Sequence, residues 1–344
     1  MNMSLSDYHA TTGDWRTALR SNERKTRLVI VTFIVVYVGV GLIVDAFILQ
    51  SLYPKAGLGQ CFRALLTFQA VPYATLIMGG LAVVSLLVTY SMYDRIMLLG
   101  TDFHEITPET AQTLQEKQLY NVVEEMKVAA GLRYMPKVFI IEANYMNAFA
   151  SGYSEKSAMV AITRGLMEKL DRAEMQAVMA HELSHIRHHD IKLTLMVAVL
   201  SNILLIVIDM LFYAVIFNRD RREDNRLVTV IIVLRYVLPL ITVMLALFLS
   251  RTREFMADAG SVELMRDNEP MARALLKIKD DYQDHAEEYK DAYAQTAHEE
   301  VRQASYLFDP SSLYSVTSLS NVISSHPTVA KRLEALGFKP KDKN

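Results

Sequence analysis

Four apolar runs divide this chain of 344 residues, and they limit its possible folds more than any other feature of the sequence. The runs cover residues 28–49, 71–90, 191–217 and 227–249. A helix needs about 20 residues to cross the hydrocarbon core of a bilayer, and each run is long enough. We therefore predict an α-helical membrane protein with two N-terminal transmembrane helices and, later in the chain, a hydrophobic helical hairpin at 191–249.

Basic residues predict the orientation of the first two helices, because basic loops stay on the cytoplasmic side of a membrane. The loop between the two helices has only Lys55 and Arg63, whereas five basic residues precede the first helix: Arg16, Arg20, Arg24, Lys25 and Arg27. Residues 1–27 are therefore expected in the cytoplasm, and the chain after about residue 91 returns there. Signal peptides have apolar cores of roughly 7–15 residues, so we expect the longer first run to be retained as an anchor.

The later hairpin, residues 191–249, either spans the membrane or lies in it as a re-entrant or interfacial hairpin. Its loop, NRDRREDNR, has four arginines and three acids, and a hairpin that spans the membrane would place these arginines outside. A re-entrant or interfacial hairpin would avoid this conflict. Asp209 and Arg235 are equally far from Arg222 at the centre of the loop, so an antiparallel hairpin brings both to the same depth. Since a lone charge there costs at least about 2.5–3.5 kcal/mol, we predict that they form an ion pair, unless each is hydrated separately.

Residues 94–190 have the mixed pattern of a small α+β domain. The spacing of apolar residues predicts a helix that begins at Thr107–Pro108 and ends at Gly131, and a second helix that begins after Asp171 and continues to Asp190. Short extended segments are predicted at residues 137–143, 147–152 and 157–163. Residues 251–344 are expected to be mainly helical, with a charged segment at 280–300 as a solvated face or a mobile excursion.

The second of these helices contains the segment AHELSHIRHHD at 180–190. His181 and His185 are four residues apart, so their imidazoles share one face of a helix at a spacing that suits two ligands of a zinc ion. Glu182 lies beside that face, where its carboxylate can take a proton from a water molecule that the metal activates. The only cysteine is Cys61, which excludes a cysteine zinc site, so the remaining ligands must be histidines or carboxylates.

The third ligand must come from another segment. The pattern HExxHxxGxxH fails, because His188 and Ile191 occupy the positions that it requires to be Gly and His, and we expect His188 to be a surface residue. Glu254 and Asp258 are four residues apart in SRTREFMADAG, so one can bind the metal while the other orients a histidine. Alternatively, Glu254 and Asp258 are solvated carboxylates paired with arginines. This alternative is less attractive because the site formed by the two histidines still lacks a ligand.

Four motifs together resemble the HtpX family of heat-shock membrane metalloproteases, with the prenyl-protein (CAAX) endopeptidases as more distant relatives: HELSH, SRTREFMADAG, NAFASG and SSHPTVAKRLEAL. The resemblance implies a zincin-like catalytic domain in two parts, 91–190 and 250–344, and a small sheet with an edge strand beside the HExxH helix. It implies one zinc ion held by His181, His185 and Glu254, with Glu182 as the catalytic base and Asp258 supporting a ligand. It further implies a multi-pass endopeptidase of the bacterial inner membrane that faces the cytoplasm and degrades unfolded or damaged membrane proteins in the stress response.

Two further motifs gain expected roles from the resemblance. Asn147 and Ala148 in NAFASG would pair with the backbone of an extended substrate, a mode with little sequence preference, although an internal strand is an equal alternative. His326 and Arg332 in HPTVAKR would lie over the zinc and donate to the oxyanion of the tetrahedral intermediate. Without the resemblance, this second motif reads as an ordinary helix start before Pro327.

A different class of function needs consideration, namely a membrane scaffold or transporter subunit with a structural metal site. A structural zinc usually has four protein ligands, and the sequence offers three and a well-placed glutamate. A transporter would need polar groups at mid-membrane along several helices, and Asp209 and Arg235 are the main examples. The net charge of −2 gives no indication of a nucleic-acid partner.

Overall fold

The computed structural model describes residues 4–11, 14–98, 101–152, 154–217, 225–289, 306–308 and 326–341. The chain forms two compact units. One unit comprises residues 1–26, 92–192 and 247–344, and it contains every residue that the sequence analysis assigns to the metal site. The other unit comprises residues 27–91 and 193–246, which are the apolar segments.

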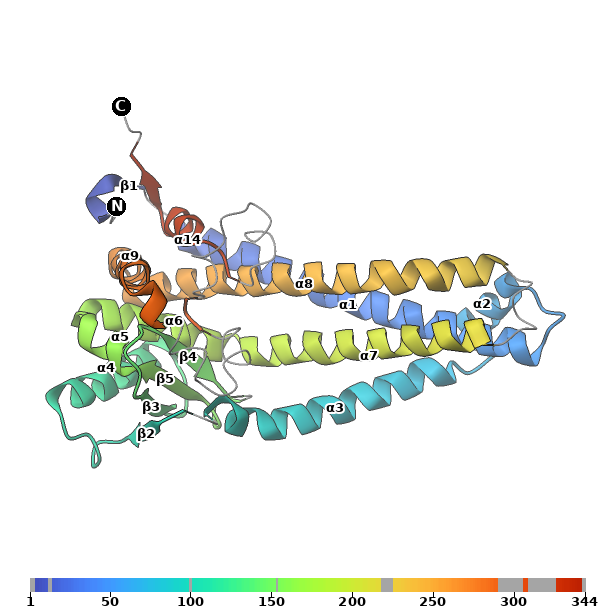
Figure 1. The fold of residues 1–344 in the computed structure, drawn as a ribbon, viewed down its shortest axis with the longest axis horizontal. Helices are drawn as coiled ribbons and strands as arrows, with labels where there is room; N and C mark the ends of the chain where they lie inside the picture. The colour runs from blue at the N-terminus through green and yellow to red at the C-terminus, as the bar shows by residue number, and fades with distance from the viewer. Residues whose placement is uncertain are drawn as a thin grey trace. The chain divides into compact units, whose positions relative to one another are not determined.

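Each of the four predicted apolar runs lies in a long helix (Figure 1). By length and composition, α1, α7 and α8 can cross a membrane, whereas the described apolar part of α3, Tyr73–Thr89, is shorter. The prediction of a helical membrane protein is therefore confirmed. The helices of this unit, some of which continue into the other unit, are α1 (Trp15–Leu52), α2 (Leu58–Leu66), α3 (Tyr73–Leu98), α7 (Asp190–Phe217) and α8 (Asn225–Met265).

Charged side chains within the apolar unit have specific partners. Asp45, near the end of the first apolar run, accepts hydrogen bonds from the backbone N–H of Ala74 (2.7 Å) and of Thr75 (3.0 Å), and so caps the N-terminus of α3. Between α7 and α8, Arg235 Nε lies 3.1 Å from Asp209 Oδ1, which confirms the predicted ion pair. Residues 218–224 of the hairpin loop lie outside the described residues. Both alternatives for the hairpin, full spanning of the membrane and a re-entrant or interfacial position, therefore stay predictions.

The unit that includes residues 92–192 is built on a four-stranded sheet with the order β2-β3-β5-β4. β3 and β5 are parallel, and the other two pairings are antiparallel. β4 forms one edge of this sheet, which agrees with the edge strand expected from NAFASG. The strands are β2 (Phe103–Ile106), β3 (Lys137–Ile141), β4 (Ala148–Ser151) and β5 (Met159–Thr163), and a separate antiparallel pair joins β1 (Tyr8–Ala10) to β6 (Phe338–Pro340).

Helices complete the same unit: α4 (Leu114–Ala130), α5 (Arg164–Lys169), α6 (Arg172–Arg187), α9 (Glu269–Asp284) and α14 (Val329–Ala335), with a short 3₁₀ turn at Leu5–Asp7. The predicted start of α4 at Thr107 was wrong. The hydroxyl of Thr107 bonds with Thr110 to close a turn, and the helix begins after Thr113, whose side chain accepts from the N–H of Glu116. Its predicted end at Gly131 is confirmed, with φ 70° at that glycine.

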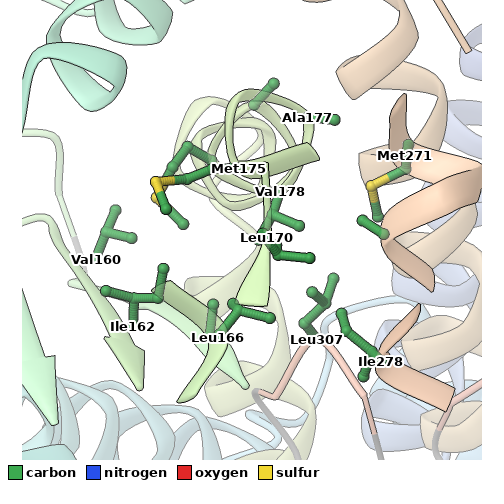
Figure 2. Packing of buried hydrophobic residues seen from close by; sticks show 14 of the residues in the cluster. Val160, Ile162, Leu166, Leu170, Met175, Ala177, Val178, Met271, Ile278 and Leu307 are labelled. Carbon is green, nitrogen blue, oxygen red and sulfur yellow. The ribbon is translucent and has the colours of Figure 1, made fainter. Parts of the chain in front are cut away.

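The HExxH helix, α6, packs between the sheet and α9. Its buried face joins strand residues such as Val160 and Ile162 and the α9 residues Met271 and Ile278 in one core (Figure 2). Asp171 caps its N-terminus, as predicted. The helix ends at Arg187 rather than continuing to Asp190, because His189 adopts a left-handed conformation with φ 55° before α7 begins.

Candidate metal centre

The two histidines of HExxH meet one carboxylate from α8. His181 Nε2 and His185 Nε2 are 3.2 Å apart, and each lies 3.7 Å from an oxygen of Glu254. Ligand atoms of these three residues all fall within 4.8 Å of one another, and all three side chains are buried. The i,i+4 spacing accounts for the two imidazole nitrogens on one helical face. The carboxylate comes from a segment about 70 residues later in the chain, and the family resemblance implied that it would be Glu254.

Neighbouring carboxylates define which ring nitrogens face the centre. His181 Nδ1 lies 3.0 Å from Asp258 Oδ1, and His185 Nδ1 lies 2.6 Å from Asp190 Oδ2. A carboxylate accepts a hydrogen bond, so each Nδ1 carries the proton and each Nε2 of the neutral ring has a lone pair. Buried histidines that are oriented in this way by carboxylates are typical metal ligands.

Two lone pairs that face each other at 3.2 Å repel unless a cation lies between them. Burial lowers the pKa of His185, but the carboxylates of Asp190 and Glu254 outweigh it and raise that pKa, whereas burial keeps the pKa of His181 below its ordinary value. Glu254 Oε2 makes no hydrogen bond of ordinary geometry within the described part of the chain. This donor set fits a divalent metal such as zinc.

Glu182 adds an acid–base group to this centre. Its side chain is 1% exposed, and its two carboxylate oxygens are buried and make no hydrogen bond of ordinary geometry with described residues. Burial raises the pKa of Glu182 to about 7, with His185 opposing the shift and Glu254 reinforcing it. A carboxyl group with its pKa near neutral can both take and return a proton at physiological pH.

Arg332 and His326 lie close to Glu254. Arg332 donates to both oxygens of Asp258, at 2.9 and 2.6 Å, and its Nη1 lies 3.5 Å from Glu254 Oε2. His326 Nδ1 lies 3.5 Å from the same oxygen. The structure therefore places both residues of the HPTVAKR motif at the metal centre, as the resemblance implied. Helix capping in this motif is done by Thr328, whose side chain accepts from the N–H of Lys331.

Comparisons with known proteins agree with this geometry. Residues 113–338 match Peptidase family M48, which covers more than half of the chain. The chain belongs to peptidase family M48. It is 39% identical over 318 residues to a "Protease HtpX homolog" of Helicobacter acinonychis (strain Sheeba), covering 92% of this chain and 96% of that protein. A second "Protease HtpX homolog", from Dictyoglomus thermophilum, is 31% identical over 325 residues, covering 93% of each chain.

Among solved structures, the crystal structure of S. mikatae Ste24p is similar, with a TM-score of 0.47 and 17% sequence identity over 96% of this chain and 68% of that one. Family membership and the three apolar helices identify a membrane-anchored metalloprotease that acts on peptide bonds, and the alternative of a scaffold or transporter subunit is not favoured. The family resemblance stated from the sequence motifs is thus confirmed.

Two residues of this M48 centre escaped the sequence analysis. Asp190, which holds His185, lies after the helix break at His189, so its direction could not be extrapolated from the helix. Gly260 lies where α8 meets α6, and a Cβ there would fall 2.0 Å from Ser184 Oγ. The absence of a side chain at this position lets α8 approach α6 closely enough for Asp258 and Glu254 to reach the histidines. His188, expected at the surface, is half-buried and hydrogen-bonded to Ser184.

The edge strand of the M48 protease is already paired. Asn147, the residue before β4, accepts a main-chain hydrogen bond from Thr163 at the end of β5. Successive residues of a strand bond on opposite sides, so the carbonyl of Ala148 points to the open edge. That carbonyl accepts a hydrogen bond of 2.9 Å from the N–H of Leu307. Asn147 is fully buried and its side-chain amide contacts Phe308. The two residues expected to hold substrate therefore contact the short segment Tyr306–Phe308 of the chain itself.

Proposed function

We propose that this chain is a zinc-dependent endopeptidase of the bacterial inner membrane that degrades unfolded or damaged membrane proteins at the cytoplasmic face, as part of protein quality control in the stress response. The observation that carries the proposal is the buried cluster of His181, His185 and Glu254 with Glu182 beside it. Two histidines and a glutamate leave a tetrahedral ion one open position, as catalytic zinc sites do.

His181, His185 and Glu254 would hold one zinc ion. The chemistry that such an ion supplies is activation of a water molecule and polarisation of the scissile carbonyl. Glu182 then takes the proton of the attacking water and passes it to the leaving amine, a role supported by its pKa of about 7. Asp258 and Asp190 keep the two imidazoles in the tautomer that presents Nε2 to the metal.

Arg332 and His326 would stabilise the negative charge that develops on the substrate oxygen. Both side chains are buried and lie 3.5 Å from Glu254 Oε2, next to the position where that charge forms. Preorganised donors of this kind, removed from water, commonly contribute more than 100-fold to catalysis. Asn147 and the backbone of Ala148 would hold an extended substrate as an added strand on β4, because β4 is an edge of the sheet.

The orientation and the substrates follow from charge and from the mode of binding. Five basic residues before the first apolar run favour a cytoplasmic N-terminus, and residues 91–190 and 250–344 would form one cytoplasmic catalytic domain interrupted by the hairpin 191–249. Backbone pairing with β4 requires an extended segment and little particular sequence. Unfolded loops and termini of membrane proteins meet that requirement, whereas folded domains do not.

The proposal is tested on the purified full chain with carboxymethylated casein as an unfolded substrate. One zinc per chain is expected by elemental analysis, with hydrolysis that stops on addition of 1,10-phenanthroline and returns with stoichiometric zinc. The orientation is tested with single cysteines placed at residue 102 or residue 60 in a Cys61→Ser background. A thiol reagent that does not cross the membrane is expected to label the cysteine at 60 in intact cells, and the cysteine at 102 only after the cells are opened. Hydrolysis that withstands removal of the metal, or labelling in the opposite sense, would refute the corresponding part of the proposal.

A further inference from the structure

The segment Tyr306–Phe308 binds the edge of β4 through its main chain. Leu307 donates its N–H to the carbonyl of Ala148 at 2.9 Å. The side-chain amide of Asn147 donates to the carbonyl of Phe308 at 3.1 Å and accepts from the N–H of Phe308 at 3.4 Å. The bond from Leu307 to Ala148 is a main-chain bond of the kind by which a peptide is added to an exposed strand, and the side chain of Asn147 supplies the other two.

The same segment reaches the metal centre. Arg332 Nη1 donates to the carbonyl of Leu307 at 2.6 Å, and this nitrogen lies 3.5 Å from Glu254 Oε2. One guanidinium group therefore links the main chain of the segment to a proposed metal ligand. A carbonyl bound in this way takes the hydrogen-bond donor that the proposed function assigns to the substrate.

The side chains of the segment are buried against specific neighbours. Tyr306 is 1% exposed and packs on the sheet, with its ring centroid 5.9 Å from that of Phe149. The ring of Phe308 lies 4.9 Å from that of Tyr282 in α9. Leu307 points into the same core as Leu170 and Ile278 (Figure 2). The segment is therefore anchored at three successive residues, by side chains as well as by its backbone.

With the segment in place, the centre is closed. Glu182 is 1% exposed, His181 is fully buried and Glu254 is 4% exposed. A substrate must bring its scissile carbonyl into contact with these groups, so part of the surrounding structure must move first. Of the described residues, Leu307 and Phe308 take the contacts that an incoming peptide needs on Asn147, Ala148 and Arg332.

We propose that Tyr306–Phe308 is an internal competitor of the substrate, which keeps the protease latent until an extended peptide displaces it from β4. The proposal rests on the role assigned above to Asn147 and Ala148. A competitor in the same chain acts at an effective concentration in the millimolar range, so a short peptide competes poorly. Because only the fraction of molecules with an open edge binds substrate, occupancy by the segment weakens apparent substrate affinity in proportion and leaves the chemical step unchanged.

The first test measures hydrogen exchange of the peptide that contains Leu307 in the full-length Glu182→Gln chain, which binds substrate without cleaving it. Saturating carboxymethylated casein is expected to remove protection of the Leu307 and Phe308 amides while β4 stays protected. Undiminished protection of Leu307 and Phe308 with casein bound would overturn the proposal, because segment and substrate would then occupy different places.

The second test weakens the competitor. In the Glu182→Gln background, the double change Tyr306→Ala and Phe308→Ala is expected to tighten binding of fluorescein-labelled casein at least about tenfold, the effect of losing roughly one such anchoring contact. With Glu182 present, the same double change is expected to lower KM and leave kcat unchanged. Phe338→Ala, which removes an equally buried ring from β6, is the matched control and is expected to change neither value.

The outcomes separate this proposal from the proposed function. If the wild-type chain cleaves casein in a zinc- and Glu182-dependent manner but the double change leaves affinity unaltered or weaker, only the internal competitor is refuted. If no variant cleaves casein, the proposed function fails, and the exchange measurement still decides whether the segment and the casein share β4. Should the double variant fail to fold by circular dichroism, the exchange measurement on the unaltered segment decides alone.

Discussion

Asp190 Oδ2 lies 2.6 Å from His185 Nδ1, so the first residue of α7 holds the second histidine of the HExxH motif. The same oxygen lies 3.6 Å from Nε of Arg253, the residue next to Glu254 in α8. One carboxylate therefore contacts a proposed metal ligand, His185, and the residue that precedes another, Glu254. Asp190 thus has a direct part in orienting a proposed ligand.

Asp190→Asn tests the role of Asp190 in orienting His185. The amide keeps the shape of the side chain and lacks its charge, so His185 is less firmly held and less basic as a ligand. Zinc affinity is expected to fall roughly 10–100-fold, as for other groups that support a metal ligand, measured by competition with a fluorescent chelator. Asp102→Asn, an exposed carboxylate in the same unit, is the control. An unchanged zinc affinity in Asp190→Asn would mean that Asp190 serves only the fold.

Substitutions of the two α8 carboxylates, Glu254 and Asp258, are expected to affect zinc binding to different degrees. Glu254 faces both Nε2 atoms, and Asp258 faces Nδ1 of His181 together with Arg332. Glu254→Ala should therefore leave the chain without zinc. Asp258→Ala should weaken zinc binding by roughly 10–100-fold and retain a site. Elemental analysis after dialysis distinguishes the two, and the reverse pattern would exchange the roles of these residues.

Much of this centre follows from short-range geometry, which a sequence expresses directly. The spacings of His181 and His185, and of Glu254 and Asp258, fix pairs of side chains on one helical face whatever the rest of the fold does. The contacts that escaped prediction depend on backbone breaks and on distant segments. His189 redirects the chain before Asp190, and Tyr306–Phe308 reaches β4 from a point 161 residues beyond Asn147 in the sequence.

The fold shows the same division. The long helices could be predicted because an apolar run long enough to cross a bilayer is easily recognised in a sequence. The strands β3 and β5 could be predicted because their residues are mainly apolar. β2, with the sequence FHEI, has a polar centre and is stabilised by pairing with β3, so nothing local identifies it. The early start predicted for α4 at Thr107 arose because a Thr-Pro-Glu turn and a helix cap have the same composition.

The effects of substituting Asp209 and Arg235 on the free energy of unfolding should be coupled rather than additive. Asp209→Leu and Arg235→Leu each leave one charge in an apolar unit, at a cost of at least about 2.5–3.5 kcal/mol. The double change leaves no unpaired charge and is expected to recover most of that loss. The arginine also lies 3.9 Å from the centroid of Phe212, so recovery should be incomplete. Thermal unfolding in detergent gives the four stabilities, and strictly additive losses would show that the pair has no coupling.

The cap of α4 should make stability depend on pH. Burial alone raises the pKa of Glu116, but the N–H groups of Gln112 and Thr113 and the side chain of Arg164 outweigh it, so this pKa lies below its ordinary value of 4.5. A lowered pKa stabilises the fold above pH 4.5, and this contribution disappears as the pH falls through the folded-state value. Unfolding midpoints of the wild type and Glu116→Gln should therefore converge between about pH 6 and pH 3. A difference between the two midpoints that stays constant over this range would contradict the prediction.

The central claim is that His181, His185 and Glu254 hold a catalytic metal for which Glu182 moves the proton, and Glu182→Gln tests it most directly. The amide is nearly isosteric and cannot accept a proton, so the variant should bind one zinc per chain, unfold at the temperature of the wild type or above, and show no hydrolysis of carboxymethylated casein above background. Hydrolysis by zinc-loaded Glu182→Gln at a rate near that of the wild type would contradict the account.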